Sequence, residues 1–192
     1  MLYTRKGDTG TTKTFGCDQR VSKSSSIAEA LGSLDEINSF LGLVKIKSNA
    51  TAGQAGNIKF ILPTGEIIVS ETINRIQQDL FIIQAELAGA PKTISEEKVK
   101  WLEEIIDGIE KTLPPIKTFF VSGGTELATL SDIARTIARR AERRVVGVVD
   151  EGKIKVGKDT LSYLNRLSSV LYAFTRSFNH KANIKEEAPR YN

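Results

Sequence analysis

The region 131–150 contains the residues best suited to chemistry, because five arginines crowd into it. On a helix that turns about 100° per residue, Arg135, Arg139 and Glu142 share one flank, and Arg143 lies beside them. Like charges at Arg135 and Arg139, four residues apart, oppose helix formation by a few tenths of a kcal/mol, roughly. A guanidinium group binds phosphate with two parallel hydrogen bonds. This flank therefore indicates a polyanion site, and the alternative is a solvated charged helix face.

A second candidate for anion binding lies in residues 1–22. Between Tyr3 and Lys13 the chain has two glycines three residues apart, several threonines and three basic side chains. Glycines let a loop point successive backbone N–H groups at one anion, as in phosphate-binding loops. Gly-Asp-x-Gly is also an ordinary turn. Both interpretations stay open on these residues alone.

The scarcity of histidine and cysteine excludes several classes of site. His180 is the single histidine and lies in a polar C-terminal segment, so metal clusters of His and Cys and a Ser-His-Asp arrangement are not expected. Cys17 is the single cysteine, which excludes an internal disulfide framework and fits a reducing cytosol.

The composition is that of one globular domain over residues 1–192, with 40% hydrophobic and 26% charged residues. The net charge of +4 suits a polyanionic partner, and a nucleotide satisfies it as well as a nucleic acid does. No apolar run is long enough to span a membrane, and the chain does not open with a signal peptide. We therefore expect a cytoplasmic protein.

Apolar residues at spacings of three and four predict five amphipathic helices that pack as an all-α bundle. Their expected ranges are 26–46, 70–90, 95 to just before Pro114, the arginine helix through 131–150, and from 159 onward. Ser26 and Glu29 have capping-box spacing, and Asp159 is the expected cap of the last helix. Short apolar runs around Pro63-Thr64-Gly65 predict a β-hairpin near 58–69. The polar segment 181–192 is predicted to be a mobile tail.

The last helix repeats the pattern of the arginine helix. Asn165, Ser169, Tyr172 and Arg176 form a polar stripe beside its core-facing leucines. A polar stripe beside a core stripe therefore recurs on two of the predicted helices.

Four blocks of residues, at 3–12, 34–39, 123–143 and 163–168, together resemble the PduO-type ATP:cob(I)alamin adenosyltransferases. The resemblance covers most of the chain in the family's order. It implies a five-helix bundle that assembles as a homotrimer with ATP held between subunits. Ser122 stands where the family commonly has Pro, and Asp132 where it often has His. Residues 49–69 match nothing in the family's pattern.

The resemblance assigns the nucleotide site to two groups of residues. The first group should wrap the triphosphate, and its members are Thr4, Gly7, Asp8, Gly10, Thr11, Thr12 and Lys23. The second group belongs to the neighbouring subunit and should hold phosphate, ribose or adenine: Arg139, Glu142 and Asn165, with Arg143 beside them.

The resemblance also implies the chemistry. Asp35 is expected to pair with Arg135 on the cobalamin side, and Phe119 to line the corrin face and displace the lower axial base of cobalt. With Arg139 these residues form the expected catalytic set. The reaction transfers the 5′-deoxyadenosyl group of ATP to cob(I)alamin, giving adenosylcobalamin and triphosphate. Mg²⁺ would be held mainly by the ATP phosphates, and a cobalamin reductase or an adenosylcobalamin-dependent enzyme is a candidate partner.

Two other functions fit parts of the sequence. One is a non-catalytic helical module that binds nucleic acid through the arginine helix. Against it, Glu142 shares the arginine face, and no aromatic residues interleave with the arginines as stacking platforms would. The other is a structural trimer that binds ATP as a regulator without chemistry.

Overall fold

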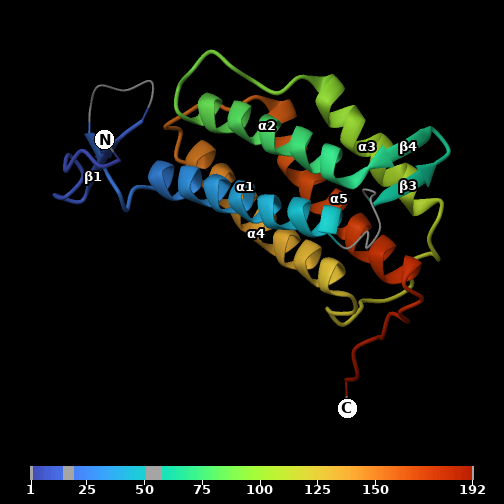
Figure 1. The fold of residues 1–192 in the computed structure, drawn as a ribbon. Coiled ribbons are helices and arrows are strands. Elements are labelled where there is room, and N and C mark those ends of the chain that lie inside the picture. The colour runs from blue at the N-terminus through green and yellow to red at the C-terminus, as the bar shows by residue number, and fades with distance from the viewer. Residues whose placement is uncertain (1, 15–19, 51–57, 192) are drawn as a thin grey trace.

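The computed structural model describes residues 2–14, 20–50 and 58–191, and five long helices dominate it. These are α1 (Ser26–Ala50), α2 (Val69–Leu87), α3 (Glu96–Glu110), α4 (Glu126–Asp150) and α5 (Lys158–Lys181). Helix α1 packs against α2 and α4, and α5 packs against α4 and α3, so α4 lies between the first and last helices (Figure 1). The predicted all-α five-helix bundle is confirmed. No helix among the described residues combines the length and the apolar character needed to cross a bilayer.

The apolar stripes predicted from spacing form a single core. Helices α1, α2 and α5 contribute large side chains such as Leu34, Ile76 and Leu164, all with no exposed surface. The stripe of α4 consists of smaller residues, and Ala134 and Ala138 are almost fully buried. Small side chains let neighbouring helices approach closely. This close packing places the polar flank of α4 next to the polar stripe of α5.

The helix ends differ in detail from the predicted caps. Ser26 was predicted to cap α1 through a capping box, but its hydroxyl donates to Glu151 Oε2 at 2.6 Å. Ser25 accepts instead, from the Ala28 backbone N–H at 3.4 Å. The residue before α5 is Gly157, and Asp159 lies in the first turn, so the predicted Asp159 cap is wrong.

The hairpin predicted near 58–69 is present. Strands β3 (Lys59–Leu62) and β4 (Gly65–Ile68) pair in antiparallel register, with Leu62 opposite Gly65. The ring of Phe60 lies 6.0 Å from that of Phe174 and 5.5 Å from that of Phe178, so the hairpin packs on the C-terminal half of α5. Residues 51–57, part of the segment 49–69 that the resemblance left unmatched, lie outside the described residues.

Two buried carboxylates connect elements that are far apart in the sequence. Asp79 on α2 is 1% exposed, accepts a hydrogen bond from the Tyr163 hydroxyl at 3.0 Å and pairs with Lys98 on α3. Burial and this neighbouring carboxylate raise the pKa of Tyr163. Glu86 at the end of α2 accepts from the Gly157 N–H at 2.9 Å and the Thr160 hydroxyl at 2.5 Å. These bonds hold α2 to α3 and to the start of α5.

The C-terminal segment follows the surface instead of leaving it at once. Lys181 is still the last residue of α5. The Glu186 carboxylate accepts two hydrogen bonds from Arg176, each 2.8 Å long, and Val121 N–H donates to the Glu187 carbonyl at 2.8 Å. These contacts anchor residues 186 and 187 of the predicted mobile tail beside the segment that precedes α4.

Candidate functional site

The N-terminal leader, residues 2–14 and 20–25, contains a short two-stranded sheet, β1 (Thr11–Lys13) and β2 (Arg20–Ser22). Gly10 has φ = 75°, a conformation that glycine adopts without steric cost. Its N–H donates to the Gly7 carbonyl at 3.1 Å, and its carbonyl accepts from the Lys23 N–H at 2.9 Å. The Arg20 guanidinium donates to the Thr11 hydroxyl at 2.7 Å and the Thr11 carbonyl at 2.8 Å. The leader is thus a folded loop.

The leader residues predicted to bind triphosphate lie together on this loop. Thr4, Asp8 and Lys23 are exposed, and Thr11 and Thr12 are half-buried. The Lys23 ammonium lies so close to Gly7 that a Cβ at Gly7 would be 3.1 Å from Nζ. Glycine at this position therefore lets the lysine amine lie over the loop. The loop itself stands beyond the N-terminal end of α1, away from the bundle (Figure 1).

A polar hollow of about 320 Å³ lies on the α4–α5 side of the bundle. Its lining includes the four residues predicted to bind nucleotide from a second subunit, namely Arg139, Glu142, Arg143 and Asn165. The Asn165 amide donates to Glu142 Oε1 at 3.0 Å, which fixes both side chains. None of the described leader residues lines this hollow.

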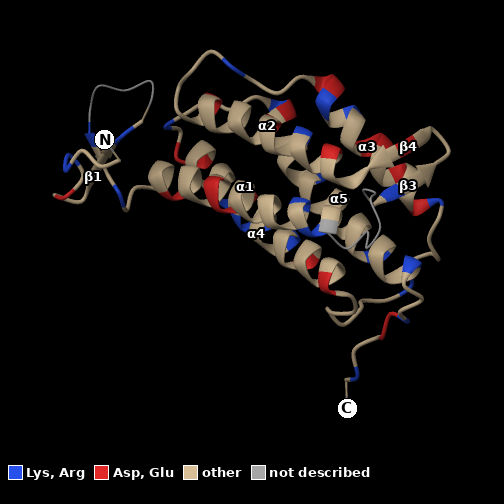
Figure 2. Cartoon of the chain, in the orientation of Figure 1, with Lys and Arg blue, Asp and Glu red and all other residues tan. Residues whose placement is uncertain are grey.

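The arginines of α4 differ in their partners. Three of them pair with carboxylates: Arg135 with Asp132, Arg140 with Glu36, and Arg144 with Glu29. Within residues 2–14, 20–50 and 58–191, Arg139 and Arg143 have no carboxylate at ion-pair distance. Both line the polar hollow. Figure 2 shows the basic positions along α4 and on the leader. The unneutralised charge of α4 therefore gathers where an anion would bind.

A larger cavity of about 520 Å³ lies next to the polar hollow and has a more apolar wall. The segment after α3 supplies Ile116, Phe119 and Phe120 to it, and α5 supplies Tyr172. Phe119 is 80% exposed, which is unusual for so large an apolar side chain and marks a surface suited to an apolar ligand. Arg139 lines both this cavity and the polar hollow, so it stands at their boundary.

Arg135 has a different partner within the chain from the one that the resemblance predicts. Its Nε donates to Asp132 Oδ1 at 2.6 Å, and its Cζ lies 5.8 Å from the centre of the Tyr172 ring. Asp35 is exposed on α1. The Asp35–Arg135 pair is thus not formed within one chain, and between chains it stays a prediction. Burial raises the pKa of the Tyr172 hydroxyl.

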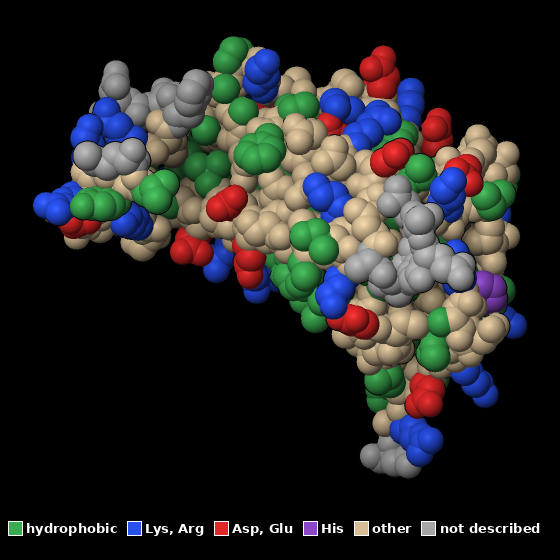
Figure 3. Space-filling model, in the orientation of Figure 1, with side chains coloured by type: hydrophobic (Ala, Val, Ile, Leu, Met, Phe, Trp, Pro, Cys, Tyr) green, Lys and Arg blue, Asp and Glu red, His purple; other side chains and the backbone are tan. Residues whose placement is uncertain are grey.

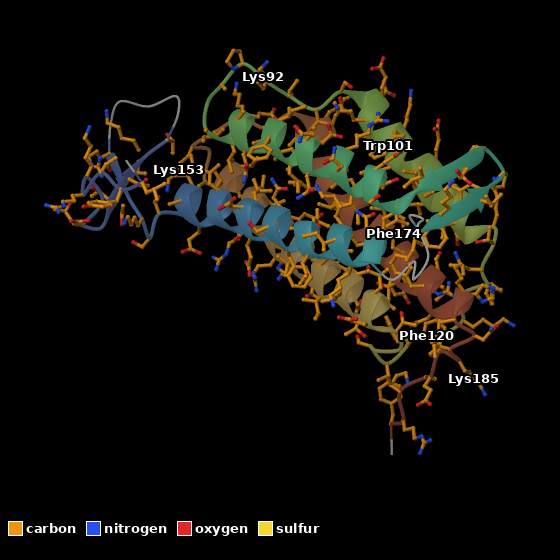
Figure 4. The ribbon with its side chains drawn as sticks, viewed as in Figure 1. Lys92, Trp101, Phe120, Lys153, Phe174 and Lys185 are labelled. Carbon is orange, nitrogen blue, oxygen red and sulfur yellow. The ribbon has the colours of Figure 1, made fainter. Side chains whose placement is uncertain are left out.

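A third hollow, of about 280 Å³, lies beside the glycine pair that precedes α4. Asn179 on α5 holds this turn by donating to the Gly123 carbonyl at 2.9 Å and accepting from the Thr125 N–H at 3.0 Å. Phe120 and Lys185 both line the hollow, and Figure 4 shows them at the end of the molecule where the C-terminal segment passes the α3–α4 connection.

Sequence reasoning missed some lining residues and assigned no metal ligand. Asp132 was noted only as a departure from the family pattern, although its spacing of three from Arg135 suits a helix ion pair. Tyr172 and Arg176 belong to the polar stripe predicted on the last helix but were not proposed as site residues. The described residues contain no cluster of three His, Cys, Asp or Glu side chains placed to hold a metal ion. Cys17 lies outside the described residues.

Comparison with known proteins identifies the family. The family model for cobalamin adenosyltransferase matches residues 2–178. The corrinoid adenosyltransferase PduO of Salmonella typhimurium is 39% identical over 201 residues, which cover 99% of this chain and 54% of the relative. The chain thus spans about half the length of that relative. The corrinoid adenosyltransferase of Bacillus subtilis is 38% identical over 187 residues, covering 95% of this chain and 89% of the relative.

Solved structures agree with the sequence relatives. A variant of the PduO-type ATP:corrinoid adenosyltransferase from Lactobacillus reuteri, complexed with cobalamin and ATP, has a TM-score of 0.84 and 31% identity, covering 99% of this chain and 97% of that one. A second variant of the same enzyme, complexed with ATP, has a TM-score of 0.81. The resemblance drawn from the sequence motifs is confirmed, and this chain belongs to the cobalamin adenosyltransferase family.

Proposed function

We propose that this chain is an ATP:corrinoid adenosyltransferase, which transfers the 5′-deoxyadenosyl group of ATP to cob(I)alamin and releases triphosphate. The observation that carries the proposal is the position of Arg139, which lines both a polar hollow and an aromatic-walled cavity. A transfer between a polyanionic nucleotide and a large, partly apolar corrinoid needs two such compartments with a cation where they meet.

The reaction requires little acid–base catalysis by the protein. Cobalt(I) of the corrinoid substrate supplies an electron pair to the 5′ carbon of ATP, the cobalt–carbon bond forms, and the carbon–oxygen bond to triphosphate breaks. No proton is removed in this step, so no general base is required. The protein supplies alignment of the two substrates and stabilisation of the charge on the departing triphosphate. The guanidinium groups of Arg139 and Arg143 are suited to the second task.

The nucleotide site would be shared between copies of the chain. The leader with its folded glycine loop stands off the bundle (Figure 1), and the polar hollow on α4 has no leader residue among those described. A homotrimer in which the leader of one copy reaches the hollow of the next would join the two halves. The triphosphate would then lie between the leader loop, with Lys23, and Arg139 with Glu142, Arg143 and Asn165. Mg²⁺ would be carried mainly by the ATP phosphates.

The corrinoid would occupy the aromatic-walled cavity. Phe119 offers an exposed ring for contact with the corrin face, and Arg135 and Tyr172 form a polar part of the wall. The reaction consumes cob(I)alamin, so a reductase that generates the cobalt(I) state is the expected supplier, and an adenosylcobalamin-dependent enzyme the expected recipient.

One assay tests the proposal. The protein is mixed with ATP, Mg²⁺ and chemically reduced cobalamin, and the spectrum is followed for the light-sensitive alkylcobalamin product. We expect product and triphosphate to appear together, and neither to form when cobalamin is left oxidised. Release of phosphate from ATP without corrinoid, or binding of ATP with no product, would contradict the proposal and favour a regulatory ATP-binding protein.

A further inference from the structure

Asp132 is an acidic residue that the fold places almost entirely inside the protein, with 7% of its surface exposed. A buried carboxylate is strongly unfavourable unless it is paired. Its Oδ1 accepts from Arg135 Nε at 2.6 Å, three residues along α4. The pair therefore satisfies Asp132, and it restricts the Arg135 side chain to one arrangement.

The other side of the Arg135 guanidinium faces α5. Its Cζ lies 5.8 Å from the centre of the Tyr172 ring, within the range of a cation–π contact. Asp132 uses only the Nε–H. Among the described residues, the two terminal nitrogens of Arg135 have no hydrogen-bond partner. Their N–H groups are therefore available to a group from outside the chain, and Asp35 of a neighbouring copy is the partner that the resemblance predicts.

The lining of two hollows shows from which side Asp132 holds Arg135. Arg135 and Tyr172 line both the 280 Å³ hollow and the 520 Å³ cavity. Of these two spaces, Asp132 lines only the smaller, whereas Phe119 and Arg139 line only the larger. Asp132 therefore contacts Arg135 from the side away from the larger cavity. The other side of the Arg135 guanidinium group lines that cavity.

We propose that Asp132 is a positioning residue for the corrinoid substrate, acting through Arg135. It keeps the terminal N–H groups of Arg135 at the wall of the larger cavity, where they can donate to Asp35 of a neighbouring copy, and this pair would complete the wall that contacts the corrinoid. It also neutralises Arg135, so the triphosphate is attracted to Arg139 and Arg143 instead. This inference rests on the proposed function, because it assigns the corrinoid to the larger cavity.

The test measures the two substrates separately. Asp132→Asn keeps the size of the side chain but removes its charge, so we expect the KM for cob(I)alamin to rise roughly tenfold while the KM for ATP stays within about twofold. Glu96→Gln is the matched control, because it removes an exposed carboxylate that pairs with Lys100 on α3, remote from the cavities. It should change neither constant.

A double-substitution cycle shows whether Asp132 acts through Arg135. We expect Arg135→Gln and the combined Asp132→Asn, Arg135→Gln protein to have the same KM for cob(I)alamin. The double variant leaves no unpaired buried charge, so this comparison stands even where Asp132→Asn alone fails to fold. A further rise on adding Asp132→Asn to Arg135→Gln would overturn the proposal, as would a rise in the KM for ATP or unchanged kinetics in a folded Asp132→Asn protein.

The wild-type protein separates this inference from the proposed function. If wild type neither forms adenosylcobalamin nor binds cob(II)alamin in a spectral titration with ATP present, the proposed function fails and the role of Asp132 fails with it. If wild type is active and the Asp132 variants match it, only the role of Asp132 is wrong.

Discussion

The arginines on the proposed nucleotide-binding flank of α4 differ from the other arginines of this helix in having no carboxylate partner among the described residues. Three of its five arginines are held by carboxylates of α1 or α4. Arg139 and Arg143 have none among the described residues, and both line the polar hollow. A nucleic-acid surface needs an extended row of unneutralised cations to engage successive phosphates. A single hollow with two such arginines is better suited to the compact charge of one triphosphate.

Replacing Arg139 should remove transferase activity without unfolding the protein. The side chain is exposed, so Arg139→Ala leaves the core intact. Loss of a charged group aimed at the leaving triphosphate should lower kcat by about 10²–10³-fold. Adenosylcobalamin formation measures the activity, and far-ultraviolet circular dichroism checks the fold. Arg144→Ala is the matched control on the same helix, because Arg144 lines none of the hollows described above. Activity of Arg139→Ala within a few-fold of wild type would remove this residue from the mechanism.

At the scale of the elements, the turn before α4 is the joint that aligns the two walls of the larger cavity. Gly124 has φ = 106°, and a Cβ there would overlap the Asn179 side-chain amide that holds the turn. Phe119 and Phe120 lie on one side of this turn, and the arginines of α4 on the other. The hydrogen bonds of Asn179 therefore fix the aromatic wall relative to the arginine flank.

Gly124→Ala should destabilise the protein by about 1–3 kcal/mol, because it combines a strained φ with the displacement of Asn179. Gly32→Ala offers a control of opposite sign. Gly32 lies within α1, and a Cβ there meets nothing within 4 Å. Alanine should stabilise that helix by roughly 0.5–1 kcal/mol. Urea unfolding measures both, and equal effects of the two substitutions would show that Asn179 does not hold the turn.

Elements that bury one apolar stripe were predictable from the sequence, because the spacing of their apolar residues records which face is inside. The five helices were found in this way, whereas the hairpin was found from short apolar runs on either side of a Pro-Thr-Gly turn. Where a polar side chain bonds to a residue far along the chain, the local spacing of residues does not predict that partner. Ser26 was expected to cap its own helix, yet its partner is Glu151. The partners of Asp79 and Glu86, on α3, on α5 and in the loop before α5, were likewise not foreseen.

The candidate site likewise contains residues that were predictable from the sequence and residues that were not. Helical spacing placed its α4 and α5 residues on polar flanks, the resemblance gave these and the leader residues their roles at the nucleotide, and the structure shows which of them share a hollow. Of the wall formed by residues 116–120, only Phe119 was predicted, because the apolar residues of this segment have no regular spacing. The Asp132–Arg135 pair was not predicted, because the family pattern directed attention to Asp35. A spacing of three on a helix was the local signal that could have revealed it.

At the scale of the whole molecule, the edge formed by α1 and α4 is more apolar than a solvated surface requires. Leu43 and Ile46 on α1 and Ile133 on α4 are 41%, 63% and 42% exposed. Figure 3 shows hydrophobic side chains along this edge. Contiguous exposed apolar surface is typical of contacts between chains. This edge is the surface that we expect to join the copies of the proposed homotrimer.

A charge on this edge should dissociate the assembly. Ile46→Glu places a carboxylate in the expected contact, so light scattering coupled to gel filtration should show a shift from trimer to monomer. Ile61→Glu is the matched control: Ile61 is 70% exposed but lies on β3, at the hairpin. It should leave the mass unchanged. A trimer that survives Ile46→Glu would place the contact on another face.

Because the leader lies apart from the hollow on α4, two inactive variants of the protein should be able to complement each other. If each site draws its loop from one polypeptide and its guanidinium groups from another, two inactive proteins with different lesions can repair each other. Chains carrying Gly7→Val, which would displace Lys23 from the loop, and chains carrying Arg139→Ala should each be inactive alone. When the two variants are unfolded together and refolded as mixed assemblies, they should regain part of the wild-type rate. Some of the shared sites then contain an intact leader loop from one chain and an intact Arg139 from the other. Complementation of this kind is impossible for a site contained within one chain.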